Sequence, residues 1–152
     1  NLPGMRSGFV AGDAQLIKSY LLYRTYHGCA MPPVHQLASI EAWKDETHVE
    51  QNRTLYTQKF DAVLEILKPV RDVTLPDAAF YLWLNTPIDD ETFARDLYAQ
   101  QNVTVLPGSY LSRESDGINP GGNHVRLALV APLDECITAA NRIKQYIETL
   151  NT

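Results

Sequence analysis

The chain of 152 residues has little cysteine, and the little that it has excludes two kinds of site. Its two cysteines, Cys29 and Cys136, lie far apart and form no CxxC pair. Together with the four histidines they show no zinc-ligand spacing, so we expect no metal site. We interpret both cysteines as buried free thiols of a protein in a reducing compartment.

Basic charge and long apolar runs are also scarce. The chain has 13 basic and 18 acidic residues, a net charge of −5, which argues against nucleic acid as the main partner because phosphate binding needs a basic face. No apolar run approaches the roughly 18 residues of a membrane span, so no membrane partner is expected. Arg6 and Asp13 interrupt the apolar run that a secretory signal needs, and we expect a cytoplasmic location.

The residues that are present predict an ordinary folded protein in two parts. Hydrophobic residues make up 45% of the chain, enough for a core. Residues 1–68 are predicted to contain one strand followed by helices, and residues 69–152 to form a complete small α+β domain. Because a single strand cannot form a sheet, we interpret the first part as a piece of a larger α/β domain.

The first part is predicted to begin with a strand over residues 5–11. Asp13 is a good N-cap and starts a helix that ends at His27-Gly28. A second helix is predicted over residues 34–43, and a third ends at Lys68 before a proline.

The second part is predicted to follow the order strand–helix–strand–strand–helix. The predicted elements are residues 78–85, 91–101, 103–106, 124–130 and 133–150. In the first strand Tyr81 and Trp83 share one face, with apolar residues also on the other, which is typical of a strand buried on both sides. In the first helix, Phe93, Leu97 and Tyr98 are predicted to point inward.

Two arginines are candidates for binding an anion. Arg6 lies between Gly4 and Gly8, and glycines allow a phosphate or another backbone to come close. Its guanidinium fork suits a phosphate or a carboxylate, although a structural ion pair is the alternative. Arg126 lies in the alternating run HVRLALV, on the face opposite its buried valine and leucines. It follows a glycine-rich loop, and we regard it as a candidate carboxylate anchor.

In order along the whole chain, the motifs NLPGMRSGF, AFYLW, VTVLPG and HVRLAL resemble the C-terminal half of the fold-type I, class I/II PLP-dependent aminotransferases. The stretch RTYHGCAMPPVHQLASIEAW resembles their succinyldiaminopimelate aminotransferase branch. The resemblance implies an α/β fold, with a piece of the large cofactor domain at residues 1–68 and the small C-terminal domain at residues 69–152.

The resemblance also implies roles for particular residues. Arg6 matches the arginine that contacts the phosphate of pyridoxal 5'-phosphate (PLP), and Arg126 matches the arginine that binds the substrate α-carboxylate. The loop His27–Met31 matches a segment that reaches the neighbouring active site in homodimers of the family. The Schiff-base lysine of the family precedes the G-x-R-x-G motif and would lie before residue 1. We therefore expect this chain to hold no catalytic lysine and to be inactive alone.

The implied activity is transfer of an amino group between an amino acid and a 2-oxo acid. The branch resemblance suggests N-succinyl-diaminopimelate and 2-oxoglutarate, a pair of lysine biosynthesis. Two alternatives stay open. Another fold-type I enzyme, such as a C–S lyase or a decarboxylating synthase, would share the same two arginines. The second alternative is a non-catalytic interaction module, although the predicted lone N-terminal strand argues against it.

Overall fold

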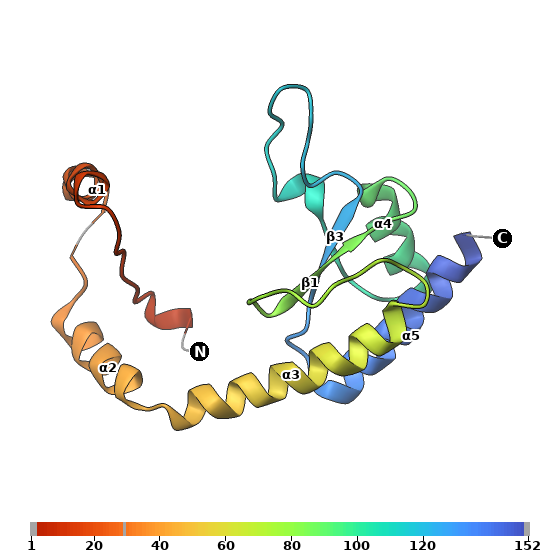
Figure 1. The fold of residues 1–152 in the computed structure, drawn as a ribbon, viewed down its shortest axis with the longest axis horizontal. Coiled ribbons are helices and arrows are strands. Elements are labelled where there is room, and N and C mark those ends of the chain that lie inside the picture. The colour runs from red at the N-terminus through yellow and green to blue at the C-terminus, as the bar shows by residue number, and fades with distance from the viewer. Residues whose placement is uncertain (1–2, 29, 151–152) are drawn as a thin grey trace. The chain divides into compact units, whose positions relative to one another are not determined.

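The computed structural model describes residues 3–28 and 30–150, and it divides the chain into two compact units, Asn1–Asn52 and Arg53–Thr152 (Figure 1). Cys29 lies outside the described residues. The functional boundary predicted after residue 68 is not the boundary between these units and stays a prediction.

The first unit is helical. It contains the 3₁₀ turn η1 (Pro3–Met5), the helices α1 (Ala14–Tyr26) and α2 (Pro33–Lys44), and the start of α3 (Thr47–Leu67). The Asp13 carboxylate accepts hydrogen bonds from two backbone N–H groups of the first turn of α1, as its predicted N-cap role requires. Neither α1 nor α2 contains a buried residue, so the described part of this unit leaves much apolar surface exposed.

The strand predicted over residues 5–11 is wrong. After η1 the chain runs on without strand pairing, because the described part of this unit offers no second strand to pair with. Side chains hold this segment instead: the rings of Phe9 and Trp43 lie 5.5 Å apart, and the Ser39 hydroxyl donates to that of Ser7 at 2.7 Å.

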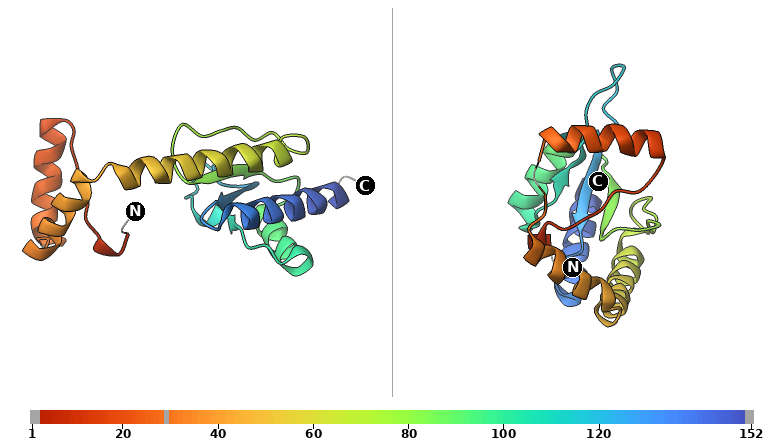
Figure 2. Two further views of the ribbon diagram at one scale, coloured as in Figure 1. Left: turned by 90° about the horizontal axis from the view of Figure 1, so that it is seen from below. Right: turned by 90° about the vertical axis from the view of Figure 1, so that its left-hand side faces the viewer.

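The second unit contains a three-stranded antiparallel sheet of order β1-β3-β2 (Figure 2). Its elements follow the predicted strand–helix–strand–strand–helix order: β1 (Tyr81–Asn85), α4 (Asp90–Gln101), β2 (Leu106–Pro107), β3 (His124–Ala128) and α5 (Leu133–Leu150). The short turn η2 (Gly108–Tyr110) follows β2. The strand predicted over 103–106 is shortened, since its ladder with β3 includes only Leu106 and Pro107.

One face of this sheet forms the core. Leu82 and Leu84 of β1 and Val125 of β3 are fully buried against α3, α4 and α5. The two-sided burial predicted for β1 is wrong, because these helices cover one face only: Trp83 is 38% exposed on the other. The inward orientation predicted for Tyr98 is also wrong, since its side chain is 59% exposed.

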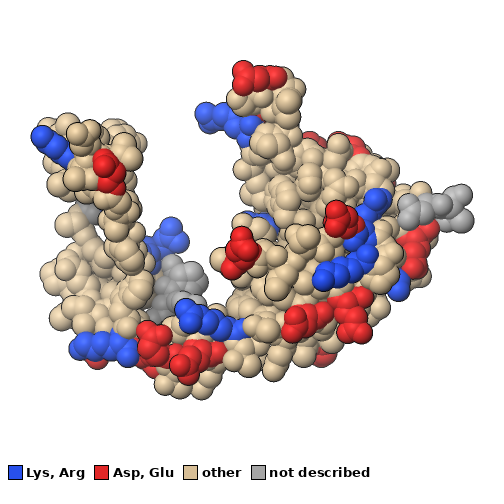
Figure 3. All heavy atoms as spheres, viewed as in Figure 1, with Lys and Arg blue, Asp and Glu red and all other residues tan. Residues whose placement is uncertain are grey.

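The charged side chains do not gather by sign on the face seen in Figure 3. Lys and Arg side chains are interspersed with Asp and Glu over the second unit, and most of the visible surface of the first unit is uncharged. Within residues 3–28 and 30–150, no helix is both long enough and apolar enough to cross a membrane.

Two neighbouring residues of α4 test the position of the core. We expect Leu97→Ala to lower the free energy of unfolding by about 2–5 kcal/mol, because it removes a fully buried side chain and leaves a cavity. Tyr98→Ala is the matched control and should cost less than about 1 kcal/mol. Urea unfolding followed by circular dichroism measures both values, and equal losses would contradict this core.

Candidate functional site

The alternation of β3 places Arg126 on the open face of the sheet. Val125 and Leu127 point into the core, whereas His124 and Arg126 are half-buried on the opposite face. Trp83 of β1 lies directly opposite Arg126 in the ladder, and Leu106 of β2 lies opposite it on the other side. The face predicted for Arg126 from the pattern HVRLALV is confirmed, and Arg126 has a paired neighbour on each adjoining strand.

The guanidinium of Arg126 packs against an aromatic ring and has no carboxylate partner among the described residues. Its central carbon lies 5.7 Å from the centroid of the Tyr81 ring, an attractive arrangement of cation and aromatic face. Its Nε is buried and makes no hydrogen bond within the described residues, and none of the described carboxylates forms an ion pair with it. Buried donors are nearly always paired, so Arg126 keeps hydrogen-bonding capacity that the described residues do not use.

His124 and Trp83 extend the same face with a stacked pair of rings. Their centroids are 5.7 Å apart and their planes differ by 13°. His124 Nδ1 lies 2.8 Å from the carbonyl oxygen of Gly122, which can only accept, so Nδ1 carries the hydrogen in this geometry. The open face thus combines one cation with aromatic rings, a surface suited to an anion that carries an apolar or planar portion.

Asp90, the first residue of α4, is a buried carboxylate behind this face, with only 2% of its surface exposed. Its Oδ2 accepts from the backbone N–H and the hydroxyl of Ser109, at 2.9 and 2.7 Å. Its Oδ1 accepts from the backbone N–H of Asn123 at 3.1 Å. Burial by itself would raise the pKa of Asp90, but these hydrogen bonds outweigh it and hold the pKa below its usual value.

Two glycines close the base of the loop that joins η2 to β3. A Cβ on Gly108 would lie 2.2 Å from the carbonyl oxygen of Gly121, and a Cβ on Gly121 would lie 2.1 Å from that of Gly108. No other residue fits at either position without moving the backbone. Ser112 and Asn119 hydrogen-bond to each other above this contact, and the loop projects from the unit beyond them (Figure 1).

Arg6 lies in the first unit, directly after η1. Its side chain is exposed, and its φ of 50° falls in the left-handed region, which is uncommon for a residue other than glycine. Positions for a Cβ on Gly4 and Gly8 meet nothing within 4 Å. None of the described carboxylates pairs with Arg6, and both readings of this residue, an anion site and a structural ion pair, stay predictions.

The predicted site residues are thus divided between the units. Arg6 belongs to the first and Arg126 to the second, and their membership of one site stays a prediction. The loop His27–Met31 includes Cys29, which the structure does not describe. Within the described ranges no three His, Cys, Asp or Glu side chains are grouped as metal ligands.

Sequence reasoning missed two features of the site. Tyr81 and Trp83 were assigned to the core, although the alternation of β1 alone puts them on the face opposite Leu82 and Leu84. Asp90 follows Asp89 at a helix start, where either residue fits a capping role. Asp89 is the N-cap and accepts from the N–H of Thr92, and nothing in the sequence marks Asp90 as buried.

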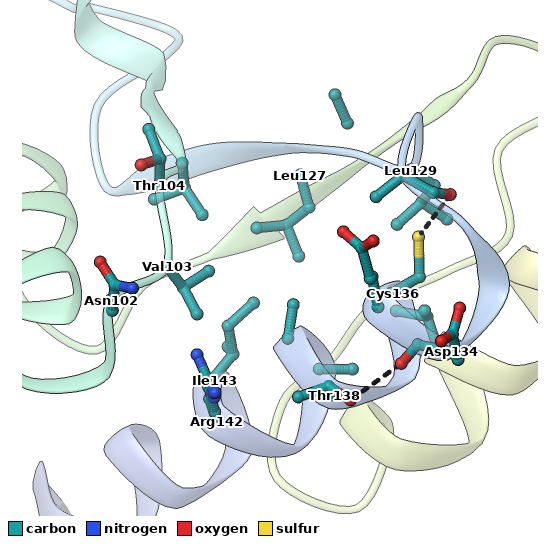
Figure 4. A pocket seen from close by; sticks show the side chains of 17 residues that line it. Asn102, Val103, Thr104, Leu127, Leu129, Asp134, Cys136, Thr138, Arg142 and Ile143 are labelled. Carbon is teal, nitrogen blue, oxygen red and sulfur yellow. Dashed lines mark hydrogen bonds between the residues drawn. The ribbon is translucent and has the colours of Figure 1, made fainter.

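A cavity of about 420 Å³ lies in the second unit (Figure 4), beside α5 and residues 102–105. Leu127 and Leu129 line it, and by strand alternation Leu127 points away from the face of Arg126. Cys136 also lines it and is a buried free thiol, as predicted; its Sγ donates to the carbonyl of Ala131 at 3.3 Å, and burial raises its pKa. The lining also includes polar and charged side chains such as Asn102, Asp134 and Arg142, but neither Arg6 nor Arg126.

Comparisons with known proteins agree on one family. A family model described as aminotransferase class I and II matches residues 1–143. A probable aminotransferase of Mycobacterium tuberculosis is 35% identical over 142 residues, which cover 92% of this chain and 32% of that protein. An LL-diaminopimelate aminotransferase of Dehalococcoides mccartyi is 27% identical over 150 residues, covering 96% of this chain and 37% of that protein.

A solved structure gives the same result for the fold. The crystal structure of an aminotransferase from Neisseria meningitidis is 54% identical, with a TM-score of 0.83 over 95% of this chain and 37% of that chain. This likeness confirms the predicted α/β fold class. The chain spans about a third of the length of the curated relatives that it matches.

The lowered pKa of Asp90 predicts how stability depends on pH. The ionised carboxylate stabilises the folded state fully above the unfolded pKa of 3.8, and this contribution is lost as the pH falls through the lower folded pKa. The unfolding free energy of the wild type should therefore exceed that of Asp90→Asn clearly near pH 6, and by much less near about pH 2.5. Urea unfolding at both pH values measures the difference. Asp77→Asn, at an exposed position, is the control, and a difference that does not vary with pH would refute the prediction.

Proposed function

The chain belongs to the class I and II aminotransferases, and on that premise we propose that a protein containing it transfers an amino group between an amino acid and a 2-oxo acid with PLP. The observation that supports this most strongly is Arg126, a half-buried cation on an open sheet face with a buried Nε that no described residue satisfies. Both substrates of such a reaction carry a carboxylate next to the reacting carbon.

Arg126 would hold that α-carboxylate. A guanidinium and a carboxylate are both planar, so two parallel hydrogen bonds fix the orientation of the carboxylate as well as its position. The fixed carboxylate in turn fixes which bond at the α-carbon is presented for reaction. Tyr81 supports the guanidinium through its ring face, and Trp83 borders it from the paired strand.

Arg6 is suited to the phosphate of PLP. The side chain is exposed and forms no ion pair within the described residues, and the flanking Gly4 and Gly8 leave open space for a large anion. A guanidinium would neutralise part of the charge of a phosphate dianion. When bound, PLP supplies the electron sink for chemistry at the α-carbon.

The finer parts of the proposal concern substrate, assembly and location. N-succinyl-diaminopimelate as donor and 2-oxoglutarate as acceptor, in lysine biosynthesis, are suggested by the stretch RTYHGCAMPPVHQLASIEAW, and similarity to an LL-diaminopimelate aminotransferase supports a diaminopimelate skeleton. The exposed apolar side chains of α1 and α2 are consistent with a homodimer of the longer protein. A cytoplasmic location completes the proposal.

Arg126 provides the direct test. In the full-length protein with PLP, we expect transfer from N-succinyl-diaminopimelate to 2-oxoglutarate, and we expect Arg126→Lys to raise the KM for the amino donor by about 10- to 100-fold, because lysine keeps the charge but loses the fork. Arg142→Ala is the control; its Nη1 donates to Gln101 O, and it lines the cavity beside α5. Initial rates over a panel of amino donors measure the effect. Elimination or decarboxylation products in place of amino transfer would favour another fold-type I enzyme.

Arg6 tests the cofactor part independently. We expect Arg6→Ala to weaken PLP binding by about 10- to 100-fold, because a charge-assisted contact to the phosphate is lost. Equilibrium dialysis of the full-length protein against PLP gives the dissociation constant without any assay of activity. Lys18→Ala removes another exposed cation of the same unit and should leave the dissociation constant for PLP unchanged. An equal loss of PLP affinity in Arg6→Ala and Lys18→Ala would show only a general effect of the positive charge on binding.

A further inference from the structure

We propose that Asp90 is a positioning residue for Arg126: its buried carboxylate ties the turn before β3 to α4 and η2, and so fixes where the guanidinium meets a substrate carboxylate. The inference rests on the proposed function, since it assigns Arg126 to that carboxylate. It concerns a residue that touches neither substrate nor cofactor and acts through the backbone.

Burying the carboxylate of Asp90 carries a free-energy cost. A carboxylate with 2% of its surface exposed is unfavourable unless it is paired or hydrogen-bonded. No described cation forms an ion pair with it, and three hydrogen bonds from Ser109 and Asn123 take that role. Three donors from two separate segments converge on one side chain, so Asp90 adds a polar connection to the short β2–β3 ladder and the Gly108–Gly121 contact that also join these segments.

Asn123, which directly precedes β3, is held through both its N–H and its carbonyl oxygen. Its N–H donates to Asp90, while its carbonyl oxygen accepts from the backbone N–H of Thr86 at 2.8 Å and from Asn85 Nδ2 at 3.1 Å. Asn123 also has a φ of 56°, a left-handed conformation that the surrounding contacts must hold. The residue is thus fixed from both sides, three positions before Arg126.

Asp90 also holds the other end of the same loop, at η2. Asp90 binds Ser109 through both its N–H and its hydroxyl, next to the mutual contact of Gly108 and Gly121. A Cβ on Gly108 would also lie 2.9 Å from the indole of Trp83, which pairs with Arg126 in the ladder. A shift of η2 would therefore be transmitted to the open face as well as to the turn.

The neighbouring Asp89 offers a matched control. It caps α4 by accepting from the N–H of Thr92 at 2.9 Å and has no hydrogen bond to Ser109 or Asn123. Asp89→Ala thus weakens the start of the same helix without loosening the turn before β3. In Asp90→Asn the size is kept, but the amide N–H₂ replaces one of the acceptor oxygens and faces donors.

The experiment compares these variants in the full-length protein with PLP. We expect Asp90→Asn to raise the KM for the amino donor by about 10-fold, with kcat within about 2-fold of wild type and PLP affinity unchanged. Asp89→Ala should leave KM unchanged. In an Arg126→Lys background the effect of Asp90→Asn on KM should fall to about 2-fold or less, because the group that it positions has been removed.

A second measurement does not depend on activity. Hydrogen exchange should be faster at the amide of Asn123 in Asp90→Asn and unchanged there in Asp89→Ala. Ser109→Ala, which removes one hydroxyl, is a milder variant for the case that Asp90→Asn does not fold, and it should raise KM in the same direction by a smaller factor.

The outcomes separate the two proposals. Equal KM values in Asp90→Asn and Asp89→Ala would overturn the positioning role, as would an undiminished effect in the Arg126→Lys background or an Asn123 amide that exchanges at the wild-type rate. A wild-type protein that transfers no amino group from any donor would refute the proposed function instead, while faster Asn123 exchange would still show that Asp90 holds the turn.

Discussion

The second unit depends on helices that cover one face of a three-stranded sheet and leave the other open. Leucines and a valine of β1 and β3 fill the covered face, and strand alternation then sends every second side chain to the open one. The same packing that buries Val125 and Leu127 therefore presents Arg126 and His124. The position of the candidate anion site follows from the core and needs no separate scaffold.

Polar and close backbone contacts fix the segment between β2 and β3, which borders that open face. β2 contributes a ladder of only two residues, so backbone pairing alone gives little rigidity to the segment between β2 and β3. The contact of Gly108 with Gly121 and the buried Asp90 carboxylate close this segment at its base. Two closely packed glycines and the buried Asp90 carboxylate thus hold this segment where strand pairing is absent.

The sequence predicted those features that depend on local pattern. The bounds of α5, the Asp13 cap, the order of elements in the second unit and the face of Arg126 are all confirmed, because capping and periodicity act within a few residues. The strand over residues 5–11 and the two-sided burial of β1 were wrong, since both depend on which partners are present. Asp90 could not be recognised, because its hydrogen-bond donors lie 19 and 33 positions along the chain.

The unsatisfied Nε of Arg126 carries a cost in stability. A buried donor without a partner costs about 1–3 kcal/mol, and a neutral side chain on the same face would avoid that cost. The ring of Tyr81 offsets part of it by attracting the cation, but an aromatic face offers no directed acceptor for an N–H in the plane of the guanidinium. Arg71 Nε and the Tyr146 hydroxyl are also buried without a hydrogen-bond partner among the described residues, so such a donor is not by itself the sign of an anion site. What distinguishes Arg126 is its position on the uncovered face of the sheet, beside Tyr81 and Trp83, where its side chain is only half-buried.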